Sequence, residues 1–113
     1  MNEVDAQSLI EQYKEAAMRH GNAKSARAAN AAAEKLATIY RALREQDMRA
    51  MLLPLLESPD PSVQSWAASH ALEFEPDAAL PVLERLAGGP PGAVRADASM
   101  TLEEWRAGRL AFP

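Results

Sequence analysis

Apolar residues recur every three or four positions along most of the chain, which is the spacing of α-helices packed against a core. No stretch shows the sustained alternation of apolar and polar residues that is typical of a strand. Residues 2–20 carry one stripe, made of Leu9, Tyr13, Ala16, Ala17 and His20, with Ile10 beside it. Residues 23–45 carry another, made of Ala26, Ala29, Ala33, Leu36, Ala37, Tyr40 and Leu43. The pattern predicts two long N-terminal helices that pack against each other.

Proline and glycine divide the remainder of the chain into shorter helices. We expect these helices at residues 48–57, 61–74, 76–87 and 93–107. Asp47 and Asp60 are placed to act as N-caps, and Pro61 and Pro76 suit a first helical turn, where a missing N–H costs nothing. The segment GGPPG, residues 88–92, is a turn. The sequence therefore predicts an all-α fold of about six helices.

Two parts of the second half repeat each other. LPLLESPDPSVQSWA at residues 53–67 parallels LPVLERLAGGPPGAVRADA at residues 80–98. Pro54 and Pro81 occupy matching places and should each kink a helix. Tandem helix pairs of this kind indicate a helical solenoid. We expect one domain over residues 1–113, with a helical hairpin at 1–46, two helix pairs at 47–107 and a tail at 108–113.

The repeated segments resemble HEAT repeats. The resemblance rests on the kinked first helix, the Asp-Pro-Ser-Val turn and the run of Val63, Ala67, Ala68 and Leu72. It implies a right-handed α-α superhelix. In the usual pattern an arginine follows the valine, whereas here Gln64 stands in the first unit and Arg95 in the second. The loss of that charge at Gln64 argues against a long array.

The whole chain is also similar to a family of small bacterial proteins, the domain of unknown function number two thousand and nineteen. The similar segments are AANAAAEKLATIYRALRE at 28–45, SWAASHALEFEPDAALPVLERLA at 65–87 and TLEEWRAGRL at 101–110. This resemblance implies a HEAT-like helical fold and no reaction. Some small bacterial HEAT-like proteins neutralise toxins as immunity proteins, which is a lead by analogy alone.

Composition and charge restrict the possible functions further. The chain has no cysteine, so a thiol nucleophile or a thiolate metal site is excluded, and its two histidines are too few for a metal cluster without carboxylates. Residues 1–15 are charged throughout and no apolar run is long enough to span a membrane, so we expect a soluble, cytoplasmic protein. The net charge of −4 is uneven, because residues 57–77 contain acidic residues but no Lys or Arg.

Four residues are candidates for contact with a partner protein: Asn30, Trp66, His70 and Arg95. Asn30 falls on the apolar stripe of the second helix, where it either makes a structural hydrogen bond or gives specificity in a groove. Trp66 either packs in the core or anchors a partner. His70 lies in line with Trp66, and no nucleophile is arranged beside it for catalysis. The expected contact surface is the face of helices 61–74 and 93–107, with residues 57–77 as its acidic rim.

The leading hypothesis is a non-enzymatic protein-interaction module, with toxin immunity as one version and no cofactor. The alternative is a nucleic-acid-associated protein, because basic residues recur with helical spacing along the second helix: Lys24, Arg27, Lys35, Arg41 and Arg44. Most such stripes are solvated faces, and only Tyr40 supplies an aromatic ring among them. An enzyme is the third hypothesis, and it lacks a nucleophile–base pair, a metal set and a phosphate-binding loop.

Overall fold

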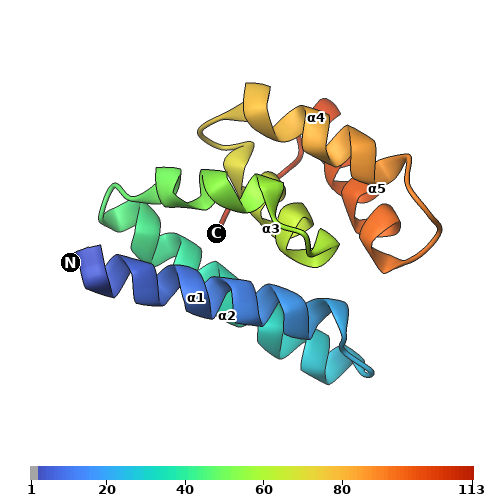
Figure 1. Cartoon of the computed structure of the whole chain (residues 1–113). Coiled ribbons are helices and arrows are strands. Elements are labelled where there is room, and N and C mark those ends of the chain that lie inside the picture. The colour runs from blue at the N-terminus through green and yellow to red at the C-terminus, as the bar shows by residue number, and fades with distance from the viewer. Residues whose placement is uncertain (1–2) are drawn as a thin grey trace. The chain divides into compact units, whose positions relative to one another are not determined.

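The computed structural model describes residues 3–113, with side chains from residue 5 onward. It contains six helices (Figure 1) and no strand within those residues, which confirms the predicted all-α fold. The helices are α1 (Glu3–Gly21), α2 (Ala26–Glu45), the 3₁₀ helix η1 (Arg49–Glu57), α3 (Pro61–Ala71), α4 (Pro76–Ala87) and α5 (Ala93–Arg106). The chain forms two compact units, one ending at Leu52 and including Pro113, the other spanning Leu53–Phe112.

In the first unit, α1 and α2 lie side by side as an antiparallel pair (Figure 1). Ser25 caps α2, because its hydroxyl oxygen accepts a hydrogen bond from the Ala28 N–H at 3.1 Å. Tyr13 from α1 and Tyr40 from α2 are both fully buried. The other buried side chains of the pair are Ala6, Ile10, Ala16, Ala17, Ala32, Leu36, Ile39 and Leu43. The wide apolar side chains are concentrated in the C-terminal half of α2.

The expected stripe on α2 is wrong in its N-terminal half. Ala26 is exposed and Ala33 is half-buried, whereas Ala32 is buried. Asn30 is exposed, so it does not lie on the buried face. Six of the first eight residues of α2 are alanines, and methyl groups on every side give little contrast between a buried and an exposed face. The larger residues, Leu36 among them, determine which face is buried.

The segment between α2 and α3 also differs from expectation. Asp47 does not cap a helix; it adopts a left-handed conformation with φ of 57° in the turn after α2. The helix that follows is a 3₁₀ helix of nine residues rather than an α-helix. Pro54 lies inside it, and because proline has no N–H and clashes with the preceding turn, it disfavours regular α-helical bonding there.

In the second unit, α3, α4 and α5 pack against one another. Asp60 caps α3 as predicted, since its Oδ1 accepts hydrogen bonds from the N–H groups of Ser62 at 2.8 Å and Val63 at 3.2 Å. The helix ends at Ala71, three residues before the predicted end, and a turn connects it to α4. Pro54 and Pro81 each occupy the sixth position of their helix, η1 and α4, which is the repetition that the sequence predicted.

Candidate partner-binding groove

Trp66 and His70 lie one turn apart on α3 and their rings are in contact. The ring centroids are 5.9 Å apart and the ring planes are inclined at 49°. His70 is only 5% exposed, so little of its side chain is accessible to a partner. Trp66 is half-buried. Most of the surface of these two side chains is therefore buried within the fold. A partner would contact the exposed part of Trp66.

Arg95 lies on the surface near the start of α5. Its Nη1 donates a hydrogen bond of 3.5 Å to the carbonyl of Gly89, in the turn before the helix. Gln64 makes the corresponding interaction near the start of α3, where its Nε2 donates to the carbonyl of Ser58 at 2.7 Å. Both side chains therefore bond a carbonyl six residues upstream, and Arg95 has a local role in closing its turn.

The basic stripe of α2 divides into two parts. Arg41 donates to the hydroxyl oxygen of Thr38 at 3.4 Å. Arg44 is half-buried, donates to the carbonyl of Pro113, and lies 5.7 Å from the centre of the Tyr40 ring. Arg41 and the N-terminal members of the stripe are exposed, so Arg44 is the one of the five basic residues that is partly withdrawn from the surface.

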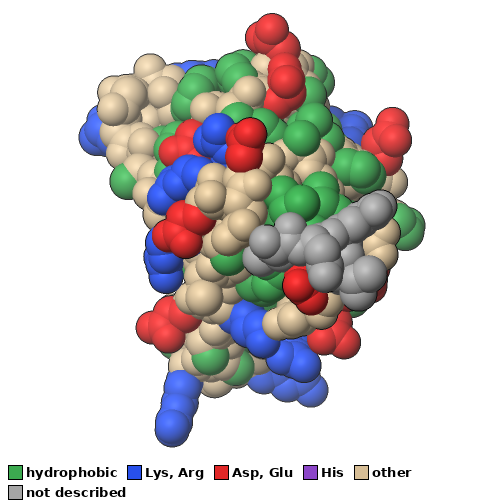
Figure 2. Space-filling model, turned by 90° about the vertical axis from the view of Figure 1, so that its left-hand side faces the viewer, with side chains coloured by type: hydrophobic (Ala, Val, Ile, Leu, Met, Phe, Trp, Pro, Cys, Tyr) green, Lys and Arg blue, Asp and Glu red, His purple; other side chains and the backbone are tan. Residues whose placement is uncertain are grey.

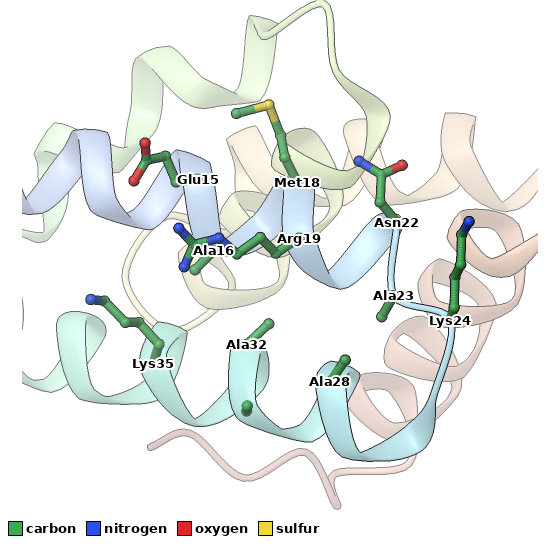
Figure 3. A pocket seen from close by; sticks show the side chains of 11 residues that line it. Glu15, Ala16, Met18, Arg19, Asn22, Ala23, Lys24, Ala28, Ala32 and Lys35 are labelled. Atoms are coloured by element: carbon green, nitrogen blue, oxygen red, sulfur yellow. The ribbon is translucent and has the colours of Figure 1, made fainter.

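An open groove of about 830 Å³ lies between the C-terminal half of α1 and the N-terminal half of α2 (Figure 3). Five alanines line it: Ala16, Ala23, Ala28, Ala31 and Ala32. Their methyl groups are too short to fill the space between the helices, so the groove is a direct consequence of the alanine-rich start of α2. Ala28 and Ala31 are exposed, and a molecule in the groove would contact them.

Three exposed cations border this groove: Arg19 from α1, Lys24 from the connection and Lys35 from α2. In Figure 3 the Arg19 side chain lies along the space between the helices, and Lys35 rises from α2 toward the same space. None of the three forms an ion pair within residues 3–113. Glu15 is the single carboxylate among the lining residues, and it points from α1 away from α2 (Figure 3).

The charges elsewhere on the surface are mixed. On the face in Figure 2, Lys and Arg side chains are interspersed with Asp and Glu. Among the described residues, exposed ion pairs join Lys14 to Glu11 at 3.4 Å and Arg106 to Glu84 at 3.2 Å. The groove differs from this mixed surface in that three cations and one carboxylate line a single hollow, and within the described residues the three cations form no ion pair.

One tyrosine in the core has a strongly shifted pKa. Burial raises the pKa of Tyr13 well above its usual value near 10, and the neighbouring Tyr40 raises it further. A tyrosine held protonated in the core serves packing. The described residues contain no group of three or more His, Asp or Glu side chains placed to hold a metal ion. No helix within them is both long enough and apolar enough to cross a membrane.

The geometry first defines a class: an all-α protein in which a proline-containing helix followed by a second helix occurs twice along the chain. The family follows from comparison with known sequences, since the profile of the HEAT repeats matches residues 10–103. The chain belongs to the HEAT-repeat family. Searches of curated proteins and of solved structures found no match.

The sequence reasoning did not find the groove. Three of the four candidate contact residues, Trp66, His70 and Arg95, were expected on the later helices, and Arg19 was not among the basic residues that the pattern singled out. The available signal was the coincidence of a small-residue helix start with basic residues at Arg19, Lys24 and Lys35. Asn30 lies on α2 near this groove in sequence but is not among the residues that line it.

Proposed function

We propose that this protein is a non-enzymatic protein-interaction module that binds its partner in the groove between α1 and α2. HEAT repeats commonly serve as protein-interaction modules, and this chain belongs to that family. The observation that carries the proposal is the alanine-lined groove with three exposed cations that form no ion pair with the described residues. A partner in the groove would remove the exposed methyl groups from water and would place opposite charges beside the three cations.

Trp66 and Arg95 remain candidates for a second contact in the other unit. Trp66 keeps part of its indole exposed, and exposed tryptophan is enriched among the residues that dominate binding energy. The carboxylates of residues 57–77 lie in the same unit and would favour a basic region of the partner. A toxin-immunity role in a bacterial cytoplasm is one specific version of this proposal, in which the partner is the toxin.

The second candidate function is nucleic-acid binding through Lys24, Arg27 and Lys35, which are exposed and make no ion pair within the described chain. No aromatic residue lines the groove beside them, so a single strand would have no ring on which to stack its bases. The net charge of −4 also opposes approach to a polyanion. Clear retention on heparin at physiological salt would favour nucleic acid, whereas elution in the wash favours a protein partner.

Site-specific photo-crosslinking in lysate of the source cells tests the proposed function. A photo-crosslinking residue replaces Ala31 in the groove or, as a control, Ala50 in η1; both are exposed alanines within helices, and Ala50 lies neither in the groove nor beside Trp66 or Arg95 in sequence. We expect a discrete protein adduct at position 31 that is missing at position 50. The same adducts at both positions, or none at position 31, would overturn the assignment of the groove.

A further inference from the structure

We infer that the occupant of the α1–α2 groove is an acidic α-helix of a partner protein, with Asp or Glu residues along the face that enters the groove. This inference rests on the proposed function, because it names the chemistry of the partner for the same groove. Three features of the groove carry it: the sign of its charges, their spacing, and the small size of its lining residues.

The sign of the charges selects an anionic partner. Arg19, Lys24 and Lys35 border the groove, and Glu15 is the one carboxylate among its lining residues. The three cations are exposed and make no ion pair within residues 3–113. A carboxylate brought to each of them forms a new ion pair without breaking an existing one. A basic segment would instead place like charges together, which is destabilising.

The spacing of the cations suits three turns of helix. Lys35 lies nine positions beyond Ala26, the first residue of α2, which corresponds to about 14 Å at the rise of an α-helix, and Lys24 precedes Ala26 by two residues in the connection. Arg19 comes from the other helix and reaches into the space between them (Figure 3). Carboxylates at positions i, i+4, i+7 and i+11 of a partner helix lie on one face and cover the same length.

The lining residues allow a helix to come close. Ala28 and Ala31 are exposed in the wall that α2 contributes, and Ala16 and Ala32 lie deeper. Helix axes pack about 8–10 Å apart depending on the side chains between them, and alanines permit the short end of that range. An amphipathic helix laid into a groove between two helices is an established mode of peptide recognition. Here the partner helix would carry small residues beside its acidic ones.

Two other occupants are distinguishable from an acidic partner helix. A nucleic-acid strand also carries negative charge, but the groove offers it no stacking ring. A second copy of this chain carries carboxylates at Glu73, Glu75 and Asp77 that are attractive to the same cations. The experiment therefore includes an oligonucleotide and a measurement of self-association.

Fluorescence anisotropy with two labelled alanine-based peptides tests the inference on the full chain. One peptide carries four glutamates at i, i+4, i+7 and i+11, and its isomer carries the same glutamates spread around the helix. We expect saturable binding of the first with a Kd below about 1 mM. The isomer should bind at least about threefold more weakly, because fewer of its carboxylates face the groove. Raising NaCl from about 20 to about 200 mM should weaken binding, since exposed charges are screened.

Matched variants locate the binding. Lys35→Glu reverses a groove cation, and Arg85→Glu makes the same change in net charge on α4. Both positions are exposed, so both variants should keep the wild-type circular dichroism spectrum. We expect Lys35→Glu to weaken peptide binding at least about fivefold and Arg85→Glu less than about twofold. Ala31→Trp, which fills the groove, should abolish binding, whereas Ala96→Trp on α5 should not.

Three results would overturn the inference: no saturable peptide binding, equal effects of Lys35→Glu and Arg85→Glu, or tighter binding of a short oligo(dT) strand than of the acidic peptide. Self-association in sedimentation velocity that Lys35→Glu abolishes would reassign the groove to a second copy. If crosslinking at position 31 persists and the acidic peptide does not compete with it, the groove still binds a protein. In that case the proposed function stands and only the acidic partner is refuted.

Discussion

Replacing Asp60 by alanine should destabilise the second unit by an amount that its hydrogen bonds define. Oδ1 of Asp60 accepts from two N–H groups, those of Ser62 at 2.8 Å and Val63 at 3.2 Å. Both donors belong to the first turn of α3, which has no intrahelical partner for them. Alanine offers no acceptor, so the two N–H groups lose their bonds together.

The magnitude follows from burial around the cap. Loss of an N-cap side chain costs about 0.5–2 kcal/mol, depending on whether water replaces it. The Val63 residue is only 1% exposed and Ser62 is half-buried, so water reaches these donors poorly. We therefore expect a loss in the upper half of that range, about 1–2 kcal/mol. For a chain of this size the melting temperature should fall by about 2–8 °C.

Urea denaturation followed by far-UV circular dichroism measures this loss. The matched control is Asp60→Asn, which keeps an oxygen acceptor and removes the charge. Because Asn and Asp are similarly effective N-caps, the control should lose only about 0.3–1 kcal/mol, the contribution of a charge near the helix dipole. An unchanged midpoint for Asp60→Ala would refute the capping argument. Equal losses for the two variants would show that charge, not the hydrogen bonds, stabilises the start of α3.

Three further changes test other parts of the fold. The raised pKa of Tyr13 means that above pH 10 the unfolded chain releases this proton while the folded chain retains it, so stability present below pH 10 should fall as the pH rises further. Tyr13→Phe should flatten that alkaline loss in urea midpoints measured across pH; an unchanged slope would assign the loss to other groups. Gly92 has φ of 153° and ψ of −176°, a backbone conformation that other residues rarely adopt. Gly92→Ala should therefore lower the free energy of unfolding by about 1–3 kcal/mol, measured by urea denaturation. An unaffected midpoint would show that the turn relaxes to accommodate the alanine. Trp66→Ala removes a half-buried ring and its contact with His70. Thermal melts should therefore show a smaller loss of folding free energy than the roughly 3–5 kcal/mol expected for a fully buried aromatic residue. A loss within that range would show that Trp66 is a core residue and not a binding anchor.

The helix boundaries that were predicted accurately are those at which the stereochemistry of one residue determines where the helix begins. Pro61 and Pro76 begin α3 and α4 at the predicted residues, because proline is compatible with the first turn and with few other helical positions. The Asp60 carboxylate caps α3 for a reason that is also local, because it accepts hydrogen bonds from N–H groups two and three residues ahead. Asp47 has the same side chain and does not cap, since its backbone is left-handed in a tight turn that the sequence pattern does not reveal.

The face of α2 was harder to predict for a reason that also explains the groove. An alanine contributes nearly the same methyl group to a core as to a surface, so an alanine-rich start of a helix has no unique buried face. The structure buries Ala32 and leaves Ala28 and Ala31 exposed. A groove exists where side chains fail to fill space, and the apolar pattern could not show this because it assigned Ala26 and Ala33 to the buried face, where the structure leaves Ala26 exposed and Ala33 half-buried.

The repeat explains why Arg95 is a weaker candidate for partner contact than its charge suggested. Gln64 and Arg95 hold equivalent places at the starts of α3 and α5, and each donates to the carbonyl six residues before it. An amide and a guanidinium perform the same local task, so that task requires a donor of sufficient reach and not a positive charge. The turn before α3 has in addition the cap of Asp60, whereas the turn before α5 has Gly92 with no side-chain cap. The bond from Arg95 is therefore the single side-chain closure of its turn within the described structure, whereas the groove cations Arg19, Lys24 and Lys35 make no such bond within the described residues and their charges are available to a partner.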